Sequence, residues 1–302
     1  MQKAIRSWAT SNQKWPLKMK SCTSLAGYAL PLPDAPVDHD VLAILLSKGR
    51  LAQIKQMYSG SFVYPHSKIS VTYVSYVTLV ILQGLLMILL LGGEKGGSGK
   101  SCLAQNLAVW LQARGGDVLL LDADPQGTTA DWAAERSAQG DLPAIPVVQA
   151  HGNIRQTLTD LRGRYRQIVV DAGGSDSEAL RSAMTVATHM LIPFRPKRRD
   201  LKTLPKVDNL ARLATAVNPA LNVRAVITQC PALPSQIQRI LDAKEACRSF
   251  GIQPLDAITT ARNVYDDADE DGCSVLESNS DPRAKEEIQT LAAELWVDAK
   301  WD

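Results

Sequence analysis

The glycine-rich segment 92–101 constrains the fold of this chain more than any other part of it. Its sequence is Gly-Gly-Glu-Lys-Gly-Gly-Ser-Gly-Lys-Ser, and it follows an uninterrupted apolar run at residues 87–91 and precedes a helical pattern. A buried strand that turns through clustered glycines into a helix is typical of a phosphate-binding loop, because backbone N–H groups converge there on an anion at the positive end of the helix dipole. The segment therefore predicts an α/β protein that binds a nucleotide.

We interpret residues 93–101 as the phosphate-loop template GxxxxGK[ST]. In this interpretation Lys100 reaches the β and γ phosphates, and the hydroxyl of Ser101 is a ligand of Mg²⁺. A glycine-rich turn that binds nothing is the alternative. The predicted phosphate cradle consists of Gly96, Gly97, Ser98, Gly99, Lys100, Ser101 and Cys102.

Strands and helices alternate from Met87 onward, which is the order that builds a parallel sheet with helices on both faces. We expect strands at residues 87–91, 118–122, 145–149, 167–171, 189–194 and 223–228. We expect helices at residues 101–114, 153–161, 177–187, 205–216, 235–250 and 283–299. The predicted fold class is a doubly wound, mainly parallel α/β sheet of the P-loop NTPase type, with the nucleotide at the carboxyl ends of the strands.

Aspartates stand at the ends of two of these strands. Asp122 ends the strand at 118–122 and precedes Asp124 by one residue, and Asp171 ends the strand at 167–171. Carboxylates beside a phosphate loop can hold Mg²⁺ or orient a water molecule, although strand-end aspartates also serve as simple caps. Asp171 has the Walker B pattern, a buried strand with a terminal carboxylate that binds Mg²⁺ directly or through water.

Residues 95–101, Lys-Gly-Gly-Ser-Gly-Lys-Ser, resemble the loop of the deviant Walker A ATPases, the ParA/MinD group of the SIMIBI class. Residues 122–127, Asp-Ala-Asp-Pro-Gln-Gly, resemble the DxDPQG motif of the same family. Residues 172–175, 191–196, 259–262 and 271–277 are similar to segments of the small ParF-like plasmid partition ATPases. The resemblance covers roughly residues 87–296.

The resemblance implies an enzyme that hydrolyses ATP with Mg²⁺ and forms an ATP-sandwich homodimer. It implies that Lys95 reaches the phosphates of the partner subunit, that Asp124 positions the attacking water, and that Asp122 supports the Mg²⁺ shell. A surface lysine is the alternative for Lys95. Cys102 departs from the family pattern, in which a second Thr usually contacts the α phosphate, so nucleotide affinity is expected to be lower than usual.

A dense group of cations follows the strand at 189–194. Such a group neutralises DNA phosphates without reading the base sequence, and the family resemblance implies nonspecific DNA binding by the ATP dimer. A solvated surface or a set of dimer salt bridges explains the group nearly as well. The candidate DNA contacts are Arg195, Lys197, Arg198, Arg199 and Lys202.

Residues 1–86 differ in character from the rest of the chain. They hold 9 Lys and Arg against 3 Asp and Glu, whereas residues 87–302 hold 24 against 28. The apolar stretch 71–86 is shorter than the roughly 20 residues of a membrane span, so stable membrane insertion is not expected. We expect 1–86 to be a poorly ordered extension or a gene start assigned too far upstream, and 87–302 to be the ATPase domain.

The sequence thus predicts a cytoplasmic ATPase that acts as a switch in plasmid or chromosome partition and associates with the nucleoid when ATP is bound. The resemblance implies a ParB- or ParG-like adaptor protein that stimulates hydrolysis. A related ATPase that positions another cargo, such as a chemoreceptor, carboxysome or conjugation component, would keep every motif named above. A membrane-anchored ATPase that uses residues 71–86 is a further alternative, and an iron–sulfur relative lacks the clustered cysteines that it would need.

Overall fold

The computed structural model describes residues 61–63, 70–72, 86–173, 177–278 and 280–296. Two short strands, β1 (Ser61–Val63) and β2 (Ser70–Thr72), pair in antiparallel fashion. The predicted extension 1–86 and the apolar stretch 71–86 lie mostly outside the described residues. Within the described ranges, every helix is too short or too polar to cross a membrane.

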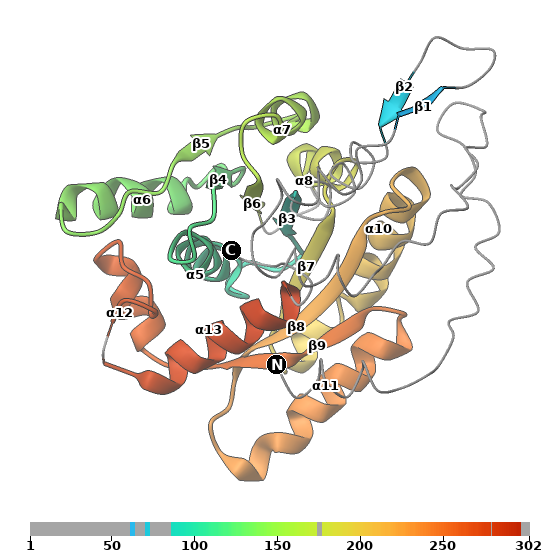
Figure 1. Cartoon of the computed structure of the whole chain (residues 1–302). Helices are drawn as coiled ribbons and strands as arrows, with labels where there is room; N and C mark the ends of the chain where they lie inside the picture. Colours follow the sequence, from blue (N-terminus) through green and yellow to red (C-terminus); the bar gives the residue numbers. More distant parts are fainter. Residues whose placement is uncertain (1–60, 64–69, 73–85, 174–176, 279, 297–302) are drawn as a thin grey trace, which may run out of the picture. The chain divides into compact units, whose positions relative to one another are not determined.

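Seven strands of the described chain form one parallel sheet, in the order β5-β4-β6-β3-β7-β8-β9 (Figure 1). Strand β3 lies near the middle, paired with β6 on one side and with β7 on the other. All carboxyl ends therefore meet at one edge of the sheet, as the sequence predicts. The strands are β3 (Met87–Leu91), β4 (Val118–Asp122), β5 (Val147–Gln149), β6 (Gln167–Asp171), β7 (His189–Phe194), β8 (Asn222–Cys230) and β9 (Gln253–Thr260).

Helices cover both faces of the sheet, and each face has its own apolar core. One core lies under α7 (Arg155–Arg162), α8 (Glu178–Met184), α10 (Leu204–Val217) and α11 (Ile237–Ser249). The other lies under α5 (Lys100–Gln112), α6 (Thr128–Gln139), α12 (Val264–Glu270) and α13 (Pro282–Leu295). The short segments α9 (Arg198–Leu201) and η1 (Pro234–Gln236) lie in connections.

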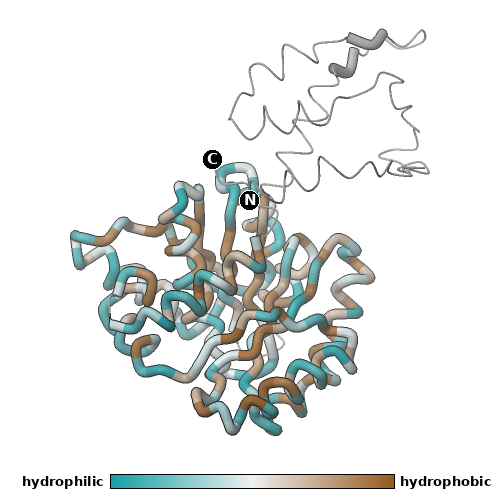
Figure 2. The backbone as a smooth tube through the Cα atoms, turned by 60° about the horizontal axis from the view of Figure 1, so that its bottom comes forward, coloured by the Kyte–Doolittle hydropathy of each residue, from teal (hydrophilic) through white to brown (hydrophobic). Residues whose placement is uncertain are grey.

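The sequence of strand β3 is apolar at every position because both of its faces are buried. Ile88 and Leu90 pack into the first core, whereas Leu89 and Leu91 pack into the second. A strand of a parallel sheet that is covered on both faces needs apolar residues at every position. The hydrophobic stretches accordingly run through the interior of the coloured tube in Figure 2, and the hydrophilic stretches lie mainly toward its outside.

From residue 87 onward the predicted elements agree closely with the structure, with one strand and three helices not predicted individually, and the two short strands β1 and β2 before it were not predicted either. Four of the expected strands have the same bounds in the structure, while β5 is shorter and β8 is longer than expected. The additional elements are β9, α6, α9 and α12. The helix expected at 153–161 begins at Arg155 in the structure, where Ile154 is the N-cap residue and the side chain of Asn153 accepts a hydrogen bond from the N–H of Arg155.

Strand β9 is the last strand of the sheet, and helix α13 covers its free edge. The two carboxylate oxygens of Glu294 accept the N–H groups of Asp256 and Ala257, each at 2.9 Å. Glu287 accepts the N–H of Thr260, also at 2.9 Å. Unpaired N–H groups on an edge strand invite pairing with another chain, so these glutamates protect the edge of the sheet.

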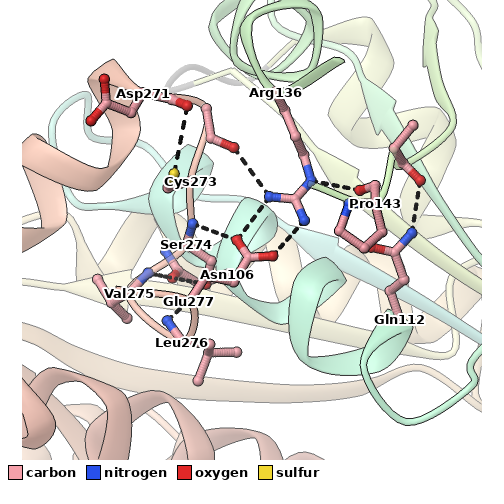
Figure 3. Close-up of polar contacts among 12 residues, drawn as sticks. Asn106, Gln112, Arg136, Pro143, Asp271, Cys273, Ser274, Val275, Leu276 and Glu277 are labelled. Atoms are coloured by element: carbon pink, nitrogen blue, oxygen red, sulfur yellow. Dashed lines mark hydrogen bonds and ion pairs between the residues drawn. The ribbon is translucent and has the colours of Figure 1, made fainter. Parts of the chain in front are cut away.

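A buried arginine joins α6 to the segment 271–277, far along the chain (Figure 3). The side chain of Arg136 is fully buried and forms two hydrogen bonds with the carboxylate of Glu277, at 2.8 and 2.6 Å. Its other donors reach the carbonyl oxygens of Pro143 and Gly272. The side chain of Asn106 on α5 binds the same segment by accepting the hydroxyl of Ser274 at 2.7 Å. This network holds α5, α6 and the 271–277 segment together.

Substituting Glu277→Ala should destabilise the protein strongly, because it leaves the guanidinium of Arg136 buried without its counterion. Removing one partner of a buried pair costs about 3 to 5 kcal/mol, measurable as the free energy of unfolding in urea. The matched control is Asp208→Ala, which breaks the more exposed helical pair with Arg212 and should cost about 0.5 kcal/mol. Equal effects of the two substitutions would contradict the structural role given to the Arg136–Glu277 pair.

Candidate active site

The loop between β3 and α5 has the backbone geometry of a phosphate cradle. Gly97 and Gly99 have φ values of +68° and +90°, which side chains other than glycine rarely adopt. Gly99 is also the N-cap residue of α5, so the loop leads directly into the helix N-terminus. Counted back from Gly99, the first glycine of GxxxxGK[ST] falls on Glu94. The loop therefore follows only the deviant form that begins at Lys95, and our interpretation of 93–101 as the common template was wrong.

The two lysines of the loop are placed differently. Lys100 is buried, and its ammonium donates a hydrogen bond to the carbonyl oxygen of Lys95 at 3.0 Å. Burial lowers the pKa of Lys100, an effect opposed by the charges of Asp171 and Asp124. For the ammonium of Lys95 itself, the described part of the chain offers no hydrogen bond or ion pair. Lys100 thus belongs to the loop of its own subunit, whereas Lys95 is available to other groups.

The carboxyl end of β8 fixes the loop from the side. The hydroxyl of Thr228 donates to the carbonyl oxygen of Ser98 at 2.8 Å, and the side-chain amide of Gln229 donates to that of Gly97 at 2.9 Å. Gln229 has a φ of +48°, an uncommon conformation for a residue other than glycine. Two loop carbonyls are therefore turned toward β8, which leaves the loop N–H groups free to face an anion.

Asp171 ends β6 beside the loop and is fully buried. Its Oδ2 atom accepts the hydroxyl of Thr129 at 2.7 Å, whereas its Oδ1 atom is buried without a hydrogen-bond partner in the described residues. Burial raises the pKa of Asp171 to about 6, and the Thr129 bond, the nearby Ser101 hydroxyl and the charge of Lys100 oppose that rise. A buried carboxylate oxygen without a partner, next to Ser101, fits a Mg²⁺ ion or one of its water ligands.

Asp122 lies directly beside Asp171 in the sheet, as its register partner. Its Oδ1 atom accepts the N–H of Asp124 at 3.0 Å, and its Oδ2 atom accepts the N–H of Ala130 at 2.8 Å. Burial raises the pKa of Asp122, and these backbone bonds oppose the rise. Asp122 therefore holds the turn between β4 and α6 in place through these two hydrogen bonds.

Asp124 is half-buried at the same edge of the sheet. Its Oδ1 atom accepts the N–H of Gln126 at 3.0 Å, and the carboxylate lies against Gly173, which follows β6. The predicted groups Ser101, Asp122, Asp124 and Asp171 thus come together at the carboxyl ends of β3, β4 and β6. Within the described ranges, no cluster of three or more His, Cys, Asp or Glu side chains forms a metal cage, and Mg²⁺ that shares its shell with phosphates and water needs none.

Cys102 lies in the first turn of α5, at the position expected to face the α phosphate. Its thiol lies 3.6 Å from the side-chain amide of Asn106, and burial raises the pKa of Cys102 to about 12. The sulfur is therefore protonated at neutral pH and is a poorer donor to a phosphate than a hydroxyl. The lower nucleotide affinity expected from Cys102 stays a prediction.

The structure separates Arg195 from the other predicted DNA contacts. Its guanidinium binds the buried carboxylate of Asp200 at 2.6 and 3.0 Å and lies beside Gly97 of the loop. Charge spacing alone did not reveal this partner, and the DNA contact of Arg195 stays a prediction. The four remaining cations are exposed around α9: Lys197, Arg198, Arg199 and Lys202.

Thr129, Thr228, Gln229 and Asp200 contribute to the site and were not predicted. A weak signal existed for Thr228, because it ended a predicted strand at the same edge of the sheet as the loop. Thr129 is the second residue after the 122–127 motif, but nothing in the sequence indicates that its side chain turns toward β6. These contacts become visible only when the strands are in register.

Comparison with known proteins agrees with this geometry. Residues 89–271, more than half of the chain, match the family model described as the CobQ/CobB/MinD/ParA nucleotide binding domain. "Maintenance of carboxysome distribution protein A" of Gloeobacter kilaueensis is 31% identical over 210 residues, which cover 68% of this chain and 92% of that protein. "Chromosome partitioning protein ParA" of Caulobacter vibrioides is 25% identical over 221 residues, covering 59% of this chain and 82% of that protein.

A solved structure shares the fold at low sequence identity. The cell division ATPase MinD of Pyrococcus furiosus superposes with a TM-score of 0.53 at 17% identity, over 70% of this chain and 99% of that one. The family model, the relatives and the loop geometry agree with one another. The chain therefore belongs to the CobQ/CobB/MinD/ParA family and is a ParA/MinD-type ATPase.

Proposed function

We propose that this ATPase is a dimerising switch that positions a cell component on DNA, with ATP and Mg²⁺ as its substrate and cofactor. The observation that carries the proposal is the division of work between the two loop lysines. Lys100 folds back onto the carbonyl oxygen of Lys95, and the Lys95 ammonium remains without a partner in the described residues. A second cation at the mouth of a phosphate loop is suited to act on the nucleotide of a facing subunit.

The reaction is the transfer of the γ phosphoryl group of ATP to water. Lys100 and the loop N–H groups bind the phosphates, and the half-buried carboxylate of Asp124 orients the attacking water. Ser101 and Asp171 would hold Mg²⁺, which neutralises charge on the β and γ phosphates when bound. Asp122 fixes the turn that carries Asp124 through two backbone hydrogen bonds.

The exposed cations around α9 support the proposed contact with DNA. None of the four takes part in an ion pair within the part of the chain that the structure describes. They follow β7 and therefore lie at the same edge of the sheet as the phosphate loop. ATP bound at the phosphate loop can therefore influence the affinity of the α9 cations for DNA, because the two sites lie close together.

The cargo and the adaptor belong to the same proposal. The names of the similar proteins include carboxysome distribution and chromosome partitioning. We propose a DNA-bound or cargo-bound adaptor protein that stimulates hydrolysis in the cytoplasm. Partition of a plasmid or chromosome, with a ParF-like mode of action, is the first candidate, and positioning of another cargo is the second.

Substituting Lys95→Ala should abolish dimerisation with a non-hydrolysable ATP analogue and lower the rate of ATP hydrolysis. Loss of one charge that stabilises the transition state costs about 100-fold in kcat or more. Nucleotide binding to the monomer should stay close to that of the unsubstituted chain. Light scattering after size exclusion, phosphate release and fluorescent-nucleotide titration measure the three quantities.

The matched control is Lys100→Ala, which should weaken nucleotide binding itself because Lys100 serves the phosphates of its own subunit. A Lys95→Ala protein that dimerises and hydrolyses ATP normally would contradict the proposed role of Lys95 in trans. Equal loss of nucleotide binding in both variants would contradict the proposed division of work between the lysines.

Substituting Arg198→Ala should weaken ATP-dependent binding to duplex DNA of random sequence. Each lost phosphate contact should reduce the slope of log affinity against log salt by about 1. The control is Arg283→Ala, which removes one exposed positive charge from α13, beside β9. Fluorescence anisotropy over a salt series measures the slopes, and identical slopes for Arg198→Ala and the unsubstituted chain would argue against this surface.

A further inference from the structure

Thr129 carries a buried hydroxyl in the first turn of α6, two residues after the 122–127 motif. It is fully buried, and its Oγ1 atom lies 2.7 Å from Oδ2 of Asp171 on β6. Thr128, its neighbour, is exposed and makes no comparable contact with the residues that the structure describes. The contact therefore joins the start of α6, which follows the turn after β4, to the carboxylate of Asp171 at the end of β6.

The hydrogen bond determines which oxygen of Asp171 remains available. A hydroxyl donor at Oδ2 fixes the rotation of the carboxylate, and Oδ1 is the buried atom without a partner among the described residues. That free oxygen is the one suited to Mg²⁺ or to its water ligand. Groups that orient a metal ligand from behind change metal affinity almost as strongly as the ligands themselves.

The position of Thr129 depends on the same turn that carries Asp124. The N–H of Ala130 donates to Asp122 at 2.8 Å, and Asp122 also accepts the N–H of Asp124. At the other end of α6, Arg136 is anchored to Glu277. The start of α6 is thus fixed in position beside the end of β6. A movement of the 122–127 turn would therefore move the Thr129 hydroxyl with it.

We propose that Thr129 is a positioning residue for the magnesium site: its hydroxyl orients Asp171 and couples the water-orienting turn to the metal. The inference rests on the proposed metal role of Asp171. It predicts that Thr129 affects the dependence on Mg²⁺ and leaves metal-free nucleotide binding unchanged. A threonine that only fills the core would affect both equally or neither.

The experiment titrates Mg²⁺ into the full chain with a fluorescent ADP analogue and compares the result with binding in EDTA. Thr129→Val keeps the shape of the side chain and removes the donor. It should raise by about tenfold the Mg²⁺ concentration that gives half of the maximal increase in nucleotide binding. The affinity for the nucleotide in EDTA should be unchanged. Thr129→Ser should restore the value of the unsubstituted chain, and Thr128→Val should have no effect.

Asp171→Asn separates the two levels of the proposal. If Asp171→Asn leaves the Mg²⁺ dependence unchanged, the metal role of Asp171 fails and the inference fails with it. If Asp171→Asn lowers the Mg²⁺ response and Thr129→Val does not, only the role of Thr129 is overturned. If the Thr129→Val protein fails to fold, Thr129→Ala takes its place. The role of Thr129 would also be overturned if nucleotide affinity fell equally in EDTA and in Mg²⁺, or if Thr129→Ser did not restore the Mg²⁺ response.

Discussion

The central position of β3 is the constraint on which the site depends. The strand is buried on both faces and paired on both edges, with β6 and β7. Its register with β6 sets Leu91 beside Asp171, and the register of β4 with β6 sets Asp122 beside Asp171. The phosphate loop therefore begins at a fixed point relative to both acidic strand ends, and α5 inherits that position at its N-terminus.

The polar contacts of the site come from segments that are distant in sequence and adjacent in the sheet. Thr228 and Gln229 bind loop carbonyls from β8, and Thr129 binds Asp171 from α6. Buried polar groups are costly unless they are paired. The loop conformation is thus held by neighbours on its flanks, and Oδ1 of Asp171 is a buried oxygen without a hydrogen-bond partner among the described residues.

The central strands and the phosphate loop could be predicted from the sequence because their patterns are local. A continuous apolar run such as residues 87–91 has few solutions other than a buried strand. Strand β9 was missed because Pro254 and Asp256 interrupt its apolar pattern. Its edge is also satisfied by Glu287 and Glu294, which lie on a helix further along the chain. The roles of Arg195 and Thr129 depend on single partners, Asp200 and Asp171, that the charge and hydropathy patterns do not reveal.

The bond between Arg136 and Glu277 has a consequence for synthesis of the chain. The two residues are 141 positions apart, and Gly272 lies against the backbone of Arg136 in the same network. A nascent chain that has left the ribosome only as far as β8 has its phosphate loop but not the counterion that fixes α6. Helix α6, which follows the turn that carries Asp124, therefore gains its Arg136–Glu277 anchor only after the segment 271–277 has been translated, long after the phosphate loop.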